Sequence, residues 1–91
     1  MPRPRTSKPR SLWHAALGQA IESVIREHGL TPDTVSKDSG LAIEQIGSYI
    51  RAQGNPTYST LLKLCIGLHV DLTELQARAQ KLLEERLSPT R

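Results

Sequence analysis

The stretch from residue 31 to residue 51, TPDTVSKDSGLAIEQIGSYIR, constrains this chain most, because it predicts two short helices joined by a tight turn. Thr31 is a suitable N-cap for the first helix, and the proline after it suits the first helical position. Gly40 favours the left-handed conformation that ends a helix. Ile46 and Ile50 then place an apolar face on the second helix. Two short helices that meet at a glycine are therefore the expected centre of the fold.

The spacing around the turn is informative about the kind of helix pair. Ser36 is a small residue four positions before Gly40, where two steeply crossing helices would crowd a larger side chain. Ile46 follows the glycine by six positions and Tyr49 by nine. This pattern is typical of a helix-turn-helix, in which the second helix is offered to the major groove of DNA.

The flanking sequence extends the pattern on both sides. RxxGLT ends at Thr31, and NPTYSTLLKLCIGLHVDLTEL runs from Asn55 to Leu75. Over roughly residues 17–75 the chain resembles the lambda-repressor-like, Cro-type helix-turn-helix (Xre) family. The resemblance implies an all-α domain of five helices that binds double-stranded DNA and regulates transcription.

Helical periodicity and turn residues suggest how the chain is divided. We expect a flexible basic arm at residues 1–10, a helix-turn-helix domain at 11–87 and a tail at 88–91. Within the domain, helices are expected at about 11–28, within 31–51, from Thr57 to His69 and, as an extended last helix, at about 71–87. Ser11 and Thr57 are suitable N-caps for the first and third of these segments. Their expected apolar stripes are Leu17, Ile21, Val24, Ile25 and His28; Leu61, Leu62, Leu64, Cys65 and Leu68; and Leu72, Leu75, Ala79, Leu82, Leu83 and Leu87.

Positive charge is concentrated at the N-terminus. The chain has a net charge of +3, and its first ten residues contain no acid but four cations, Arg3, Arg5, Lys8 and Arg10. Residues 11–91 carry eight basic and nine acidic residues and sum to −1. Because non-specific DNA affinity comes mainly from phosphate neutralisation, residues 1–10 are predicted to be an arm that lies in a minor groove or along phosphates. A solubilising tail is the other interpretation.

The resemblance places the base-contacting residues near the start of the second helix of the pair, at Ile43, Glu44, Gln45 and Ser48. Gln45 has the donor and the acceptor that a bidentate contact with adenine requires. Ile43 can meet a thymine methyl group, and Glu44 can accept a hydrogen bond from a cytosine amino group.

Phosphate contacts are expected at two other helix starts, because backbone N–H groups there bind anions without needing cations. Side chains just after the second helix, and one on the following helix, are expected to add further contacts. The expected phosphate contacts are Thr31, Thr34, Arg51, Gln53, Asn55, Thr57, Tyr58, Ser59 and Lys63.

Several positions depart from the family's usual pattern and support an alternative. The family usually has Gln at the position of Pro32, Ser or Thr at Ala42 and Glu at Ile50. The second helix also carries Glu44 but no cation before Arg51. Such a surface would also suit a protein partner. The alternative function is therefore a protein-interaction module on the same fold, such as an antirepressor, an antitoxin-like partner or a subunit of a larger regulator.

The last helix is longer than a five-helix core needs. Its leucines beyond Leu75 form either a dimer seam or the docking face for the first helix. Dimers give this type of domain useful specificity, because two half-sites about one helical turn apart are then read together. We expect a homodimer that uses Leu82, Leu83 and Leu87.

Catalysis, a cofactor and a metal ion are not expected. Cys65 lies in an apolar stripe and is predicted to be in the core, and the spacing of His14, His28 and His69 matches no zinc site. No apolar run is long enough to span a membrane, and a single cysteine fits a reducing cytoplasm. The leading hypothesis is a sequence-specific repressor of the bacterial nucleoid that binds double-stranded DNA, with a regulatory protein as a further candidate partner.

Overall fold

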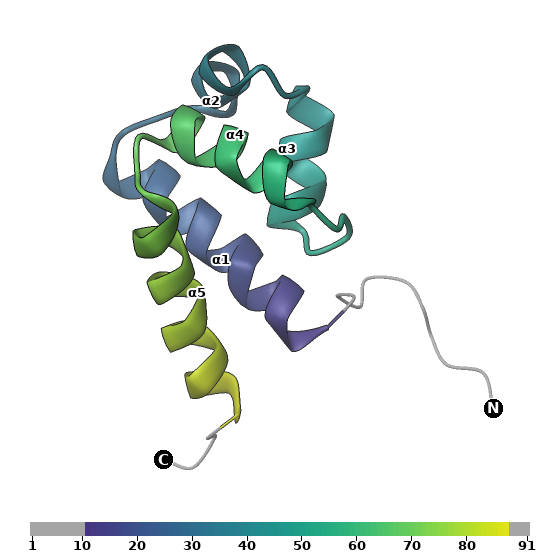
Figure 1. Cartoon of the computed structure of the whole chain (residues 1–91), viewed down its shortest axis with the longest axis vertical. Coiled ribbons are helices and arrows are strands. Elements are labelled where there is room, and N and C mark those ends of the chain that lie inside the picture. The colour runs from purple at the N-terminus through teal and green to yellow at the C-terminus, as the bar shows by residue number, and fades with distance from the viewer. Residues whose placement is uncertain (1–10, 88–91) are drawn as a thin grey trace, which may run out of the picture.

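Five helices joined by short turns form residues 11–87, the part of the chain that the computed structural model describes (Figure 1). They are α1 (Leu12–Glu27), α2 (Pro32–Ser39), α3 (Ile43–Ile50), α4 (Tyr58–Leu68) and α5 (Leu72–Leu87). Residues 11–87 contain no strand, so the expected all-α, five-helix fold is confirmed. The arm expected at residues 1–10 and the tail expected at 88–91 lie outside the described residues.

The first and last helices lie side by side and make the most extensive helix–helix contact (Figure 1). Hydrogen bonds join Arg86 to Gln19 and Arg78 to Glu27, so α1 and α5 run antiparallel. The second large contact is between α2 and α4, and α3 packs on α1 and α2. The helix pair α2–α3 is therefore held by α1 and α4, which leaves the outer side of α3 uncovered within the described residues.

Three helices begin at the hydroxyl caps that the sequence predicts. Each cap hydroxyl accepts a hydrogen bond from the backbone N–H three residues later, which satisfies one of the unpaired donors of the first turn. The pairs are Ser11 with His14 at 3.1 Å, Thr31 with Thr34 at 3.2 Å, and Thr57 with Thr60 at 3.2 Å.

The turn between α2 and α3 has the predicted glycine geometry. Gly40 has a φ of 80°, and its N–H donates to the carbonyl oxygen of Ser36 at 2.9 Å. The Ser36 hydroxyl donates to the carbonyl oxygen of Leu41 at 2.6 Å, so the small residue also fixes the chain beyond the turn. Leu41 is 7% exposed and packs in the core.

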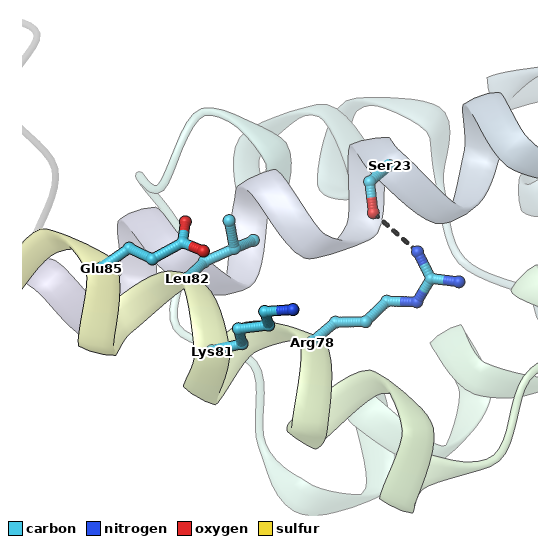
Figure 2. Close-up of a pocket in the computed structure, with 5 residues that line it drawn as sticks. All are labelled: Ser23, Arg78, Lys81, Leu82 and Glu85. Atoms are coloured by element: carbon cyan, nitrogen blue, oxygen red, sulfur yellow. Dashed lines mark hydrogen bonds between the residues drawn. The ribbon is translucent and has the colours of Figure 1, made fainter.

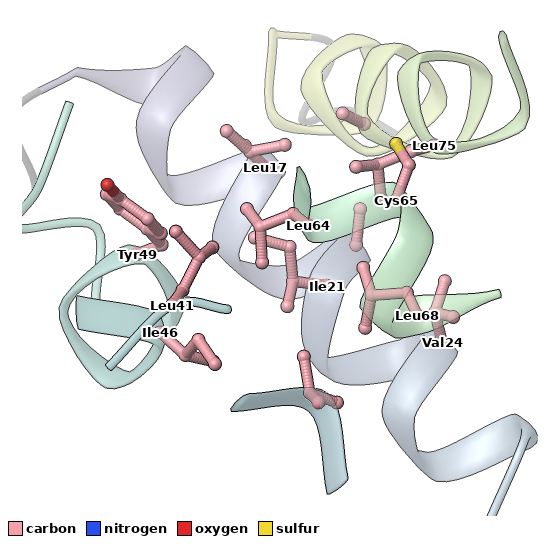
Figure 3. Packing of buried hydrophobic residues seen from close by; sticks show 13 residues of the cluster. Leu17, Ile21, Val24, Leu41, Ile46, Tyr49, Leu64, Cys65, Leu68 and Leu75 are labelled. Carbon is pink, nitrogen blue, oxygen red and sulfur yellow. The ribbon is translucent and has the colours of Figure 1, made fainter. Parts of the chain in front are cut away.

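The core is aliphatic and receives side chains from every helix (Figure 3). Its largest fully buried side chains are Ile21, Val24, Val35, Ile46, Leu64, Leu68 and Leu75. Cys65 is 5% exposed within this cluster, which confirms the prediction that it belongs to the core. Burial raises the pKa of the Cys65 thiol, and the nearby negative charge of Asp71 raises it further.

The expected apolar stripe on α4 includes more residues than the structure buries. Leu62 is 39% exposed instead of buried, and the neighbouring Ile66 is 63% exposed. The helix is covered on one side by α1, α2 and α5, and the side that carries Leu62 and Ile66 has no neighbouring element in residues 11–87. His28 also lies at the edge of its stripe: it is exposed, and its Nδ1 is 2.9 Å from the carbonyl oxygen of Leu68.

The stripe on α5 serves mainly as the docking face for α1. Ala79 is fully buried and Leu82 packs against the core. Leu83 is half-buried, whereas Leu87 is 61% exposed. Of the three leucines expected in a dimer seam, Leu82 thus packs against the core of its own chain. Leu83 and Leu87 retain exposed surface that a partner can contact.

Polar contacts also fix α5 to α1. The Arg78 guanidinium lies 2.6 Å from a Glu27 carboxylate oxygen and 3.0 Å from a Glu74 carboxylate oxygen. It also donates to the Ser23 hydroxyl at 3.1 Å (Figure 2). The hydrogen bond from Arg78 and its positive charge hold the pKa of Glu27 below its ordinary value. Ser23 and Arg78 line an open pocket between the two helices together with Lys81, Leu82 and Glu85. None of the helices in residues 11–87 is long and apolar enough to cross a membrane.

Candidate nucleic-acid interface

The candidate surface is the outer side of α3, which two buried residues position. Ile46 is fully buried and Tyr49 is 7% exposed, so the opposite side of the helix faces outward. At the start of α3, Ile43 is 44% exposed and Glu44 is also exposed. Gln45 and Ser48 are half-buried. Two of the four predicted base-contacting residues are therefore exposed, and two lie at the edge of the exposed side.

The side chains of Gln45 and Ser48 have partners within α3. Gln45 Nε2 donates a hydrogen bond to Tyr49 Oη at 2.9 Å, and the Ser48 hydroxyl donates to the Gln45 carbonyl oxygen at 3.1 Å. Ala42, the N-cap of α3, makes no side-chain capping hydrogen bond, as its methyl group requires. The sequence places Tyr49 one helical turn after Gln45, but the bond between them was not predicted.

Positive charge reaches the middle of α3 from its C-terminal end. A Cβ atom added at Gly47 would lie 3.0 Å from Arg51 Nη1, so the guanidinium folds back over this glycine. A longer side chain at position 47 would displace it. The sequence predicted no cation on this helix before Arg51; the fold brings the Arg51 charge about one turn closer to its N-terminal end.

The loop after α3 is fixed to that helix by backbone hydrogen bonds. The N–H groups of Gln53 and Gly54 both donate to the Ser48 carbonyl oxygen, at 2.8 and 3.3 Å. Ala52 has a φ of 62°, a left-handed conformation that an L-residue adopts only where the surrounding packing enforces it. Ala52 is 4% exposed, so it is held in place by close packing.

The same loop is also tied to the start of α1. His14 Nε2 is 3.0 Å from Asn55 Oδ1, and His14 Nδ1 is 2.6 Å from the Ser11 hydroxyl. Asn55, which was predicted to contact phosphate, therefore uses its side-chain oxygen within the fold. His14 was not among the predicted site residues, and no local pattern could have paired it with a residue 41 positions away.

The remaining predicted phosphate contacts lie on two helix starts and beyond them. Thr31 and Thr34 lie at the start of α2, where their hydroxyl oxygens are 3.0 Å apart. Thr57, Tyr58 and Ser59 lie at the start of α4, where Tyr58 is 67% exposed. Lys63 is exposed one turn further along α4. The predicted arm cations, Arg3, Arg5, Lys8 and Arg10, lie outside the described residues.

A metal centre is not formed in this part of the molecule. Residues 11–87 contain no group of three histidine, cysteine, aspartate or glutamate side chains placed to hold a metal ion. The groups that remain for recognition are hydroxyls, amides, backbone N–H groups at helix starts and the Arg51 and Lys63 side chains. These groups suit hydrogen bonding to bases and phosphates.

Comparisons with known proteins agree with this geometry. The sequence model of the helix-turn-helix family matches residues 21–75. Among solved structures, the clp gene regulator ClgR from Corynebacterium glutamicum superimposes with a TM-score of 0.80 at 18% identity, covering 89% of this chain and 86% of that chain. No curated protein sequence matches the chain.

Two restriction-modification controller proteins are also similar in structure. The controller protein C.Esp1396I has a TM-score of 0.76 at 21% identity, with 82% of this chain and 99% of that chain covered. The controller protein C.AhdI from Aeromonas hydrophila has a TM-score of 0.65 at 29% identity, covering 68% of this chain and 94% of that chain.

Proposed function

This chain belongs to the lambda-repressor-like, Xre-type helix-turn-helix family of DNA-binding transcription regulators, and we propose that it is a sequence-specific repressor that reads the major groove with α3. The observation that carries the proposal is the orientation of α3: Ile46 and Tyr49 are buried, while Ile43 and Glu44 are exposed. The family consists of regulators and not of enzymes. A protein of this kind acts on the nucleoid in the bacterial cytoplasm.

Three of the four predicted base-contacting residues of α3 have a complementary group on a base edge in the major groove. Gln45 would contact adenine, Ile43 a thymine methyl group and Glu44 a cytosine amino group, with Ser48 beside them. Phosphates would be bound at the starts of α2 and α4, where N–H groups and hydroxyls lie together. Arg51, Gln53, Asn55 and Lys63 would add to these phosphate contacts, and the basic residues 1–10 would supply sequence-independent affinity.

Replacing Gln45 with alanine is expected to remove discrimination at one base position, at a cost of roughly 1–3 kcal/mol of binding free energy. The first step is to select bound duplexes from a random-site library, with the intact protein at physiological salt. Affinities of the wild-type protein and the variant are then measured for the selected site and for its single-base variants.

Gln76→Ala is the matched control, because Gln76 is exposed on α5 and the change removes the same amide. It should leave base preference unchanged. If Gln45→Ala leaves affinity and base preference as they were, α3 does not read the groove through Gln45.

Removing residues 1–10 should weaken binding to all sequences alike and reduce its salt dependence, because fewer counterions are released.

A homodimer would bring two copies of α3 to the two half-sites of a palindrome. Two of the exposed apolar surfaces in residues 11–87 are candidates for the dimer contact: the end of α5, with the half-buried Leu83 and the exposed Leu87, and the outer side of α4, with Leu62 and Ile66. We propose the end of α5, where the half-buried Leu83 and the exposed Leu87 follow one another along one face.

Leu87→Asp is therefore expected to shift the protein from dimer to monomer, since burying a carboxylate in an apolar contact is strongly unfavourable. Sedimentation equilibrium measures the shift. Ile66→Asp is the matched change on the other surface, and it should leave the dimer intact. The opposite outcome, dissociation by Ile66→Asp alone, would assign the dimer contact to α4.

The second candidate function is a protein-interaction module on the same fold. It is favoured by the exposed apolar side chain of Ile43 beside Glu44 and by the net charge of −1 outside the first ten residues. This function would be indicated by DNA binding that disappears entirely with residues 1–10, together with a tight protein partner whose binding Ile43→Asp abolishes.

A further inference from the structure

Gln45 and Tyr49 lie one turn apart on α3, and their side chains are joined by a hydrogen bond. Gln45 Nε2 donates to Tyr49 Oη at 2.9 Å. Tyr49 is 7% exposed, whereas Gln45 is half-buried at the edge of the outward side. A base-reading side chain is thus connected directly to a residue of the core.

The Tyr49 ring has little freedom to move. A Cβ atom added at Gly54 would lie 2.8 Å from Tyr49 Cδ1 and Cε1, so the loop backbone rests against the ring. The N–H of Gly54 also donates to the Ser48 carbonyl oxygen, which fixes the loop to α3. At Gly18 of α1, an added Cβ would lie 2.7 Å from the Tyr49 carbonyl oxygen, so α1 packs closely against the backbone of this residue. The hydroxyl therefore occupies a fixed position.

A glutamine side chain has two N–H donors and one carbonyl acceptor. The bond to Tyr49 uses one N–H and leaves one N–H and the oxygen. That remaining pair is what a bidentate contact with adenine N7 and N6 needs.

We infer that Tyr49 is a positioning residue whose hydroxyl holds the Gln45 side chain in place, with one N–H and the carbonyl oxygen left for a bidentate contact with adenine. This inference rests on the proposed function, because it concerns how α3 reads one base. Tyr49 contacts no base; it acts through Gln45. A free glutamine on a helix surface samples several rotamers, and fixing it in advance reduces the entropy lost on binding.

Tyr49→Phe tests the inference, because it removes the hydroxyl and keeps the buried ring. The preference for adenine at the Gln45 position should fall about tenfold, a difference of the size of one good base contact. Affinity for random-sequence DNA should not change. Adding Gln45→Ala to Tyr49→Phe should cost nothing beyond Gln45→Ala alone, since the two residues act as one unit.

Tyr58→Phe is the matched control, because Tyr58 is the only other tyrosine of the chain and is 67% exposed at the start of α4. Loss of the Tyr58 hydroxyl should lower the affinity equally for all DNA sequences, without changing base preference. If Gln45→Ala changes base preference and Tyr49→Phe does not, the positioning role is wrong and the proposed function stands. If neither variant changes base preference, α3 does not read the groove through Gln45, and the inference fails together with that base contact.

A second measurement uses the unmodified protein, so it does not depend on how the variants fold. The side-chain amide protons of Gln45 should exchange with solvent more slowly than those of the exposed Gln76, as observed by NMR. Equal exchange rates would mean that Tyr49 does not hold the Gln45 amide, and would overturn the inference.

Discussion

Replacing Gly18 with alanine is expected to destabilise the fold by about 3 kcal/mol. An added Cβ would lie 2.4 Å from the Ile50 carbonyl oxygen and 2.7 Å from that of Tyr49. Both atoms belong to the backbone of α3, so no side-chain rotation can relieve the overlap, and α3 must move away from α1. The greater helix propensity of alanine, worth roughly 1 kcal/mol, offsets only part of this cost.

Urea denaturation monitored by circular dichroism measures the change in the free energy of unfolding. Gly47→Ala is the matched control in α3, because its Cβ would meet only the flexible end of Arg51, at 3.0 Å. That variant should be neutral or more stable by up to about 1 kcal/mol. Equal stabilities for the two variants would contradict a close contact between α1 and the end of α3.

Ile46→Ala is expected to cost about 3 kcal/mol of stability, the ordinary loss for a large aliphatic side chain in a core. Ile46 is fully buried and packs with the cluster that includes Leu41 and Leu64 (Figure 3). The change leaves a cavity beneath α3, so the position of the whole helix is weakened along with the core. Thermal denaturation should show a clear decrease in Tm.

Ile43→Ala makes the same chemical change three residues earlier on α3, where the side chain is 44% exposed. Its stability should stay within about 0.5 kcal/mol of the wild-type value, while its affinity for the selected DNA site should fall. A stability loss at Ile43 as large as that at Ile46 would mean that α3 is oriented differently on the core.

The helices and their ends could be predicted from the sequence because their signals are local. A hydroxyl cap, a glycine at a turn and an apolar periodicity act within a few residues, and Ser11, Thr31, Thr57 and Gly40 behave as predicted. The fold class could be predicted for the same reason, since the order and spacing of these signals match the family.

Other features depend on which elements meet, and local patterns do not contain that information. The exposure of Leu62 follows from how many helices cover α4, and the contact of His14 with Asn55 joins residues 41 positions apart. The close approach at Gly18 likewise depends on α3 crossing α1. The candidate base contacts were predicted by position alone, so the connection between Gln45 and Tyr49 became apparent only with side-chain geometry.

The antiparallel pairing of α1 with α5 has a consequence for the order of events during synthesis. The ribosome delivers α1 first and α5 last, and their contacts join residues 51 and 67 positions apart. Until α5 has emerged, the side of α1 that it covers remains open to water and to chaperones. The nascent chain therefore completes this core only after α5 has emerged, and premature termination before α5 would release a product with an unfinished core.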